Sequence, residues 1–211
     1  MKVEEIFFRD MYRQICLLTG AGVVKLVNLH SLFDFPPDEK LDGFLTYAYI
    51  DGETFTFEIM AGAKTLGGRA KMFPVAYKKI VKLKRAQVDD ADIKIVTAEY
   101  ILPFRDRIEM ISDRAKSSRE QTRLIKNLDA FRHPNYPDDA VVYFFSEADK
   151  PAELLWVRCA SVDENILTGE LLNEPNKNFG IHAGDKIKFG VAQIGEQDIL
   201  IYLPSKEDSI A

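Results

Sequence analysis

The stretch of residues 154–189 places the strongest constraint on the fold, because three short apolar segments alternate there with polar turns. The first segment, residues 154–160, has apolar side chains on both faces of an extended strand, which is typical of a central strand. The second and third segments, residues 166–172 and 186–189, carry polar side chains at alternate positions, as strands with one solvated face do. The stretch therefore predicts three strands, of which the first two form a hairpin.

A polar loop, residues 173–185, separates the second and third strands and carries candidate binding residues. Pro175 has no amide hydrogen to give to a sheet, and asparagine tolerates left-handed backbone conformations, so strand pairing must stop in this loop. Trp156 and Arg158 share one face of the first strand and would add an aromatic and cationic surface, although a single tryptophan on a central strand also fits a core position. The predicted ligand or partner surface consists of Trp156, Arg158, Asn173, Glu174 and Asp185.

The same loop supports a second hypothesis, a small hydrolase. His182 titrates near neutral pH, and Glu174 or Asp185 would complete an acid and base pair with it. An exposed histidine beside a turn that Asp185 caps accounts for the same residues without catalysis. The sequence therefore favours a non-enzymatic binding or protein-interaction module, and the alternative is a small hydrolase that uses Glu174, His182 and Asp185.

Three short motifs follow one another in this part of the chain: Trp156-Val157, Gly169-Glu170-Leu171-Leu172-Asn173-Glu174-Pro175 and Gly184-Asp185-Lys186-Ile187. Their order resembles the signature of a small bacterial domain of unknown function, the YegJ-like group. The resemblance covers roughly residues 137–211 and implies a fold unit only, because the family has no established activity. The chain departs from the family pattern at Gly195-Glu196-Gln197, where the family tends to place an Asp-Trp pair.

The beginning of the chain predicts a mixed helical and extended region ahead of this unit. Apolar residues recur at helical spacing in residues 4–19 and stop at a pair of glycines, which predicts an N-terminal helix. Residues 23–29 are apolar and β-branched, and they predict a strand. Asp51-Gly52 lies at the centre of the alternating stretch 44–60, and this dipeptide supplies the positive φ angles of a tight hairpin turn.

The middle of the chain favours helices. Residues 74–86 fit either a helix or a strand, because their apolar side chains match both spacings. Residues 93–102 favour a strand that stops at Pro103. Residues 104–132 predict two consecutive helices or one broken helix, because apolar residues recur there at helical spacing.

Two prolines and two acidic residues in the segment 133–139 indicate a linker between domains. We therefore predict an α+β fold in two parts. Residues 1–132 form a region with an N-terminal helix, a β-hairpin and a helical segment. Residues 140–211 form a compact antiparallel β-rich C-terminal unit.

The segment 59–88 is cationic within an acidic chain, because it holds eight basic residues and no acidic one. Its glycine spacing approaches that of a phosphate loop, but Gly68-Arg69 stands where lysine and serine or threonine are required. A run of like charges usually faces water, and this explanation is favoured over a phosphate-bearing ligand or an acidic protein partner. The anion-binding candidates are Lys64, Arg69, Lys78, Lys79 and Lys82.

Composition and charge narrow the kinds of partner, cellular location and metal site that the chain can have. The 28 basic and 33 acidic residues give a formal net charge of −5, which does not favour nucleic acid as a partner. Neither a membrane span nor a signal peptide is predicted, because charged residues interrupt every apolar run. Cys16 and Cys159 predict buried, reduced thiols in the cytoplasm, and three scattered histidines predict no metal site. We expect no cofactor, and we expect a protein partner or a small anionic ligand.

Overall fold

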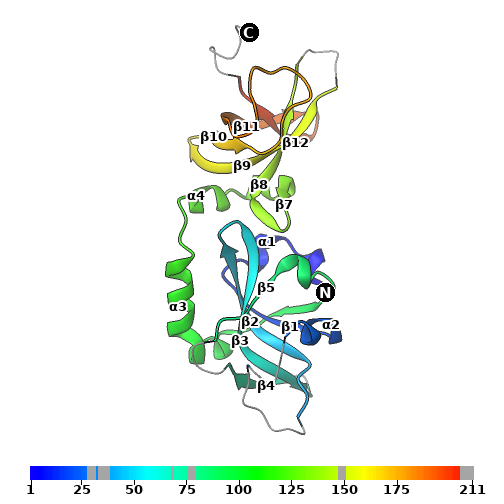
Figure 1. The fold of residues 1–211 in the computed structure, drawn as a ribbon, viewed down its shortest axis with the longest axis vertical. Coiled ribbons are helices and arrows are strands. Elements are labelled where there is room, and N and C mark those ends of the chain that lie inside the picture. Colours follow the sequence, from blue (N-terminus) through cyan, green and yellow to red (C-terminus); the bar gives the residue numbers. More distant parts are fainter. Residues whose placement is uncertain (28–31, 33–38, 68, 76–78, 147–150, 205–211) are drawn as a thin grey trace. The chain divides into compact units, whose positions relative to one another are not determined.

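The computed structural model describes residues 1–27, 32, 39–67, 69–75, 79–146 and 151–204. The contacts within the chain divide it into two units, Met1–Lys116 and Ser117–Ala211. Each unit has its own six-stranded sheet and its own hydrophobic core (Figure 1). The mixed α+β class with a β-rich C-terminal part agrees with the prediction.

The first unit is built on an antiparallel sheet with the strand order β4-β3-β2-β1-β6. The fifth strand, β5, pairs with the first half of β3, whereas β4 pairs with its second half. The strands are β1 (Ile15–Thr19), β2 (Gly43–Asp51), β3 (Thr54–Leu66), β4 (Arg69–Pro74), β5 (Lys82–Lys84) and β6 (Asp92–Ile95). The predicted hairpin is confirmed, since β2 and β3 pair from Asp51 and Thr54 outward and Gly52 has a φ angle of 63°.

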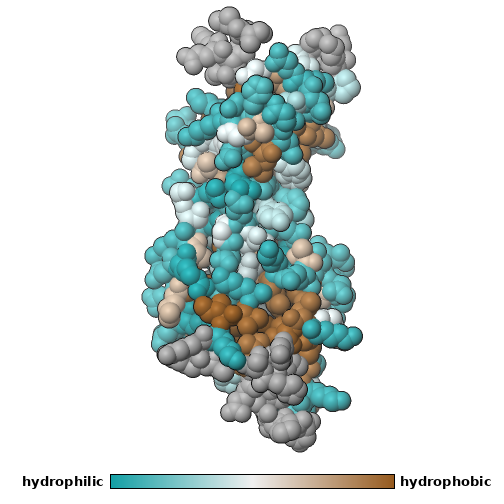
Figure 2. Space-filling view, viewed as in Figure 1, coloured by the Kyte–Doolittle hydropathy of each residue, from teal (hydrophilic) through white to brown (hydrophobic). Residues whose placement is uncertain are grey.

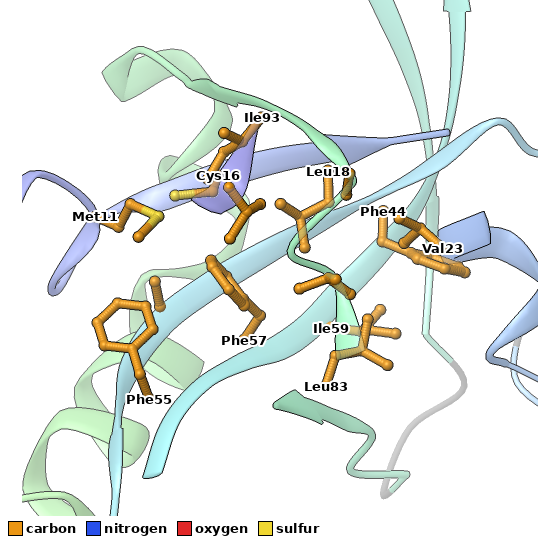
Figure 3. Close-up of a cluster of buried hydrophobic side chains, with 14 of the residues drawn as sticks. Met11, Cys16, Leu18, Val23, Phe44, Phe55, Phe57, Ile59, Leu83 and Ile93 are labelled. Atoms are coloured by element: carbon orange, nitrogen blue, oxygen red, sulfur yellow. The ribbon is translucent and has the colours of Figure 1, made fainter. Parts of the chain in front are cut away.

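Both faces of this sheet are covered. One face packs into a core that includes Phe44, Phe55, Phe57 and Ile59 (Figure 3). The other face packs under helix α3 (Arg105–Arg114), which contributes Ile111. The shorter helices of this unit are η1 (Val3–Glu5), α1 (Phe8–Met11), α2 (Ala21–Lys25), η3 (Arg85–Gln87), η4 (Ala98–Tyr100) and η5 (Leu102–Phe104). In Figure 2, hydrophobic residues gather over the sheet of this unit and beside α3.

The N-terminal layout differs from the prediction. Residues 4–19 do not form one helix: α1 ends at Met11, Arg13 has a positive φ angle of 59°, and β1 follows. The four residues 15–18 are all buried, because β1 lies inside the sheet between β2 and β6. A short apolar run of this kind matches a helix and a buried strand equally well, and tertiary pairing decides between them. Residues 21–25 form α2 where the sequence predicted a strand over residues 23–29.

The middle of the chain agrees with the prediction in part. Within the ambiguous segment 74–86, the described residues include strand β5 and the start of η3, and residues 76–78 lie outside the described part. Strand β6 ends at Ile95, so the predicted strand over 93–102 is shorter than expected. The helices α3 and α4 (Glu120–Arg123) are separate, which is one of the two predicted alternatives, and η6 (Lys126–Phe131) follows them as a 3-10 helix.

The second unit has six strands, of which the last five form an antiparallel meander that closes on itself. Its strands are β7 (Arg132–His133), β8 (Tyr136–Phe144), β9 (Glu153–Asp163), β10 (Ile166–Leu171), β11 (Lys186–Ile194) and β12 (Gln197–Tyr202). An odd number of alternating strands can close only through one parallel pair, and β12 indeed meets β8 in parallel at Ile201 and Tyr143. The three strands predicted from the central stretch are confirmed as β9, β10 and β11.

The core of this barrel comes from the inward-facing residues of its strands. On β9 these are Leu155, Val157 and Cys159, whereas Leu154, Trp156 and Arg158 face outward. The outward residues are exposed or half-buried, so Trp156 does not occupy a core position. The two thiols, Cys16 and Cys159, are free and buried, and burial raises their pKa values to about 12 and about 11.

The structure places the segment 133–139 inside the second unit, whereas the sequence predicted a linker there. These residues form the β7–β8 hairpin, and the division into units falls instead between Lys116 and Ser117. Asp138 and Asp139 are buried because arginines neutralise them: Arg123 forms a two-pronged ion pair with Asp138 at 2.7 and 2.8 Å. The sequence did not reveal these ion pairs, so acidic residues beside prolines were interpreted as a linker.

Within the described residues, no helix is both long enough and apolar enough to cross a membrane.

Candidate functional site

The loop of residues 172–185 connects β10 to β11 and is joined to β9 by backbone hydrogen bonds. The backbone N–H of Leu172 donates to the carbonyl of Trp156 at 2.8 Å, and the N–H of Trp156 donates to Oδ1 of Asn173 at 2.9 Å. At the other end of the loop, the N–H of Gly184 donates to the carbonyl of Leu171 at 2.7 Å. The loop therefore begins and ends at fixed positions on the barrel.

Glu174, His182 and Asp185 lie together in this loop. Oε1 of Glu174 is 2.7 Å from Nδ1 of His182, and its other oxygen accepts the N–H of Ala183 at 2.9 Å. Oδ2 of Asp185 accepts the backbone N–H of His182 at 2.7 Å. The structure thus brings the three predicted residues together. Asp185 accepts a hydrogen bond from the backbone of His182, whereas Glu174 contacts the side chain of His182 and the backbone of Ala183.

The pair of Glu174 and His182 is charged over a wide pH range. The N–H of Ala183 and the ring of His182 hold the pKa of Glu174 below its usual value. The hydrogen bond to Glu174 raises the pKa of His182 above its usual value. Both shifts favour an imidazolium–carboxylate pair, which is a stable arrangement for a turn.

This pair is open to solvent, which limits its chemistry. The side chain of His182 is 78% exposed and that of Glu174 is 60% exposed. Water at such a site screens charges and solvates any developing oxyanion, so the site lacks the dry enclosure that makes electrostatic catalysis effective. The geometry is that of an exposed ion pair beside a turn.

The rest of the loop is held by a second carboxylate and by two apolar side chains. Glu153 on β9 accepts the backbone N–H groups of Asn176 at 2.7 Å and Lys177 at 3.2 Å. Phe179 packs against Phe144 of the core with ring centroids 5.5 Å apart, and the buried Ile181 joins the same core. Both halves of the loop are therefore fixed, although the loop contains no regular secondary structure.

Aromatic side chains cover the outer face of β8 and β9 beside this loop. Trp156 is half-buried, and its ring centroid lies 5.3 Å from that of His133. Along the same face, Tyr143 is paired with Leu154, which is 53% exposed. Arg158, the other predicted residue of this face, forms a two-pronged ion pair with Asp139 at 2.8 and 3.1 Å. Arg158 therefore has an intramolecular partner, and its role in binding stays a prediction.

The cationic candidates do not form one surface. Lys64 pairs with Glu39 at 3.0 Å, and Lys82 pairs with Asp51 at 2.6 Å. Arg69 lines a cleft of about 450 Å³ beside β6, whereas Lys79 lines another cleft of about 490 Å³ beside α3. Lys78 lies outside the described residues.

A buried carboxylate under α3 was not predicted from the sequence. The side chain of Glu58 on β3 is only 2% exposed, and Arg107 and Arg114 of α3 donate to its two oxygens at 3.2 and 2.7 Å. The hydroxyl of Tyr49 donates to the same carboxylate at 3.0 Å. The sequence alone does not show that Glu58 is covered, because Arg107 of the covering helix follows 49 residues later in the chain.

One sequence signal pointed to this cluster. Arg107, Ile111 and Arg114 follow the helical spacing i, i+4, i+7, so two arginines flank an apolar residue on one face of the predicted helix. Basic side chains on the buried face of a helix require acidic partners in the sheet below.

Among the described residues, no three histidine, cysteine, aspartate or glutamate side chains gather in a way that would hold a metal ion.

Comparison with known proteins gives one match. The model of a bacterial family described as "Uncharacterized protein conserved in bacteria (DUF2314)" matches residues 109–203. This match supports a bacterial domain of unknown function over the C-terminal part of the chain, while the YegJ-like assignment stays a prediction. Searches of curated proteins and of solved structures found no match.

Proposed function

We propose that the second unit is a non-catalytic binding module, which recognises a protein segment through the 172–185 loop and the outer face of β8 and β9. The observation that carries this proposal is the hydrogen bond from the backbone N–H of Trp156 to Asn173. This bond joins the rigid loop to the aromatic face, so that the two form one continuous surface.

A fixed loop favours recognition because it loses little conformational entropy when a partner binds. The carboxylates of Glu153, Glu174 and Asp185 each accept backbone N–H groups of the loop, which holds its shape in the free protein. Charged groups remain at its surface, since His182 and Glu174 are mostly exposed. These groups suit the polar rim of an interface, where contacts determine orientation more than affinity.

The outer face of β8 and β9 suits the centre of an interface. Aromatic residues are enriched at protein interfaces, and exposed apolar side chains beside them add area that water leaves on binding. Tyr143 and Phe145 stack with ring centroids 6.3 Å apart, and Phe145 is 48% exposed. Together with Trp156 and Leu154 they give an apolar strip bordered by the charged loop.

The first test is capture of a protein partner by the full chain, followed by titration. Trp156 is the only tryptophan, so its fluorescence reports directly on this surface. Leu154→Asp places a charge at the centre of the strip and is expected to weaken binding about tenfold or more. Ile194→Asp is the matched control, because Ile194 is similarly exposed, at 56%, but lies on β11. Equal loss in both variants, or no change in either, would contradict the proposal.

The hydrolase alternative rests on the 2.7 Å contact between Glu174 and His182. It is tested by incubating the protein with simple ester and peptide substrates. Turnover that disappears in both Glu174→Gln and His182→Asn would favour the hydrolase. The binding module predicts no turnover above that of a heat-denatured sample.

A further inference from the structure

We infer that the cleft beside α3 in the first unit binds a small anion that carries an apolar body. The cleft has a volume of about 490 Å³, which lies in the usual range of small-molecule sites. The inference concerns a different unit from the proposed protein-binding surface and does not depend on it.

The polar end of the cleft is preorganised by a buried carboxylate. Glu58 accepts hydrogen bonds from the Nη2 atoms of Arg107 and Arg114. The hydroxyl of Tyr49 donates to Glu58 and accepts a hydrogen bond from Arg114. These bonds fix two guanidinium groups before any ligand arrives. A fixed guanidinium binds a carboxylate or sulfonate with less loss of side-chain entropy than a mobile one does.

Donor atoms remain available at this end. The bonds of both arginines to described residues use Nη2, so their Nε and Nη1 atoms have no partner among the residues that the structure describes. The side chains are also reachable, because that of Arg107 is 28% exposed and that of Arg114 is 44% exposed. Each guanidinium can therefore keep its bond to Glu58 and donate to a ligand.

The charge of the lining favours an anion. Among the lining residues that the structure describes, three side chains are basic (Lys79, Arg107 and Arg114) and two are acidic (Glu58 and Asp106), which is a formal excess of one positive charge. A ligand with one negative charge would neutralise this excess. A dication would be repelled by it, and an uncharged ligand would leave the free guanidinium donors without acceptors.

The walls of the cleft are apolar. They consist of Met60, Pro74, Val75, Ile80, Pro103, Phe104, Met110 and Ile111. Met110 is 72% exposed and Ile80 is 56% exposed, so an apolar ligand body would cover side chains that now face water. The expected ligand class is thus an aryl or medium-chain carboxylate or sulfonate, with the anionic group directed toward Arg107 and Arg114.

The test uses two probes of the same shape and different charge. The first is 1-anilinonaphthalene-8-sulfonate, and the second is N-phenyl-1-naphthylamine, which has the same aromatic body without the sulfonate. Both are titrated against the full chain by fluorescence. We expect saturable binding of the sulfonate with an affinity at least about tenfold higher than that of the neutral amine, because two charge-assisted hydrogen bonds form only with the sulfonate.

Variants assign the binding to this cleft. Lys79→Gln is expected to weaken sulfonate binding about threefold, and Arg114→Gln about tenfold. Arg105→Gln is the matched control, since it removes one positive charge from the same helix, α3, at an exposed position outside the cleft lining. Neither Lys79 nor Arg105 bonds to Glu58 in the described contacts, so Lys79→Gln tests the inference even if Arg114→Gln fails to fold.

Two results would overturn the inference. One is equal affinity for the sulfonate and the neutral amine, which would mean that the probe binds any apolar surface. The other is an equal effect of Lys79→Gln and Arg105→Gln, which would mean that net charge alone attracts the anion. Preserved binding of the neutral amine in Arg114→Gln, with loss of sulfonate binding, would support it.

Discussion

Replacing Asp138 by asparagine tests the ion pair that makes segment 133–139 part of the second unit. The side chains of Asp138 and Arg123 are each 1% exposed, and two hydrogen bonds of 2.8 and 2.7 Å join them. Asp138→Asn removes the negative charge with almost no change in shape. The buried guanidinium of Arg123 then loses its main partner, and breaking a buried pair in this way costs about 3–5 kcal/mol.

The lower end of that range applies here. Arg123 retains Glu120, whose carboxylate lies 2.8 Å from Nη1 and whose side chain is 28% exposed. This neighbour compensates part of the lost charge, so we expect a loss of about 3 kcal/mol in the free energy of unfolding. With a urea m value of about 1 kcal/mol/M for a unit of this size, the midpoint falls by about 3 M.

Tryptophan fluorescence during urea unfolding measures this loss in the intact chain, because the only tryptophan, Trp156, lies in the second unit. Asp198→Asn is the control, an exposed carboxylate on β12 whose loss is expected to stay within about 0.5 kcal/mol. The double replacement of Arg123 by methionine and Asp138 by leucine should lose less than Asp138→Asn alone, because it leaves no unpaired charge in the buried site; Glu120 and Arg119, which each lose one partner, are 28% exposed. A midpoint shift below about 1 M for Asp138→Asn would refute the reasoning.

Three further outcomes are expected. Gly184→Val should destabilise the protein by about 1–3 kcal/mol in thermal denaturation, because Gly184 has a φ angle of 93°; an unchanged melting temperature would contradict this. Limited trypsin digestion should cut first after Lys116, whose side chain is 73% exposed at the division between the units, and early cleavage after Arg132, at the start of the 133–139 segment, would argue against the hairpin. The pKa of His182 is raised, so its stabilising effect is present at low pH and is lost as the pH rises through the pKa of His182. The pKa of Glu174 is lowered, so its stabilising effect is lost as the pH falls through the pKa of Glu174. The pair should therefore stabilise the loop most between about pH 4.5 and 6.5, and an NMR titration in which Glu174→Gln leaves the pKa of His182 unchanged would exclude the pair.

Local chemistry made part of the fold predictable. The Asp51-Gly52 dipeptide favours a hairpin because glycine readily adopts a positive φ angle, as Gly52 does in the structure, and β2 and β3 lie in the predicted places. The alternation in β9 likewise indicated which side chains share a face, although both faces are apolar and the inward one was not predicted. The loop between β10 and β11 was predictable because Pro175 and its neighbours cannot continue a strand. Each of these predictions depends on residues close together in the sequence.

Pairing between distant residues was not predictable in the same way. Residues 15–18 have an apolar pattern that suits a helix, and they become a strand only because β2 and β6 lie on either side. Glu58 is buried because α3 covers it, and the two arginines that neutralise it lie 49 and 56 residues away in the sequence. The convergence of Glu174 and His182 was proposed from the sequence because only eight residues separate them.

Two of the buried carboxylates, Glu58 and Asp138, differ in whether a ligand can reach their arginine partners. In both cases an acidic residue of a strand faces two arginines in or next to a helix: Glu58 faces Arg107 and Arg114, and Asp138 faces Arg123, with Arg119 at 3.7 Å. An ion pair whose members are both sealed from water can only hold elements together, because no ligand can reach it. Arg123 is 1% exposed, whereas Arg114 is 44% exposed and borders a cleft. The same residue pattern therefore anchors a helix in the second unit and, in the first, leaves a fixed guanidinium facing an apolar cleft where an anion can bind.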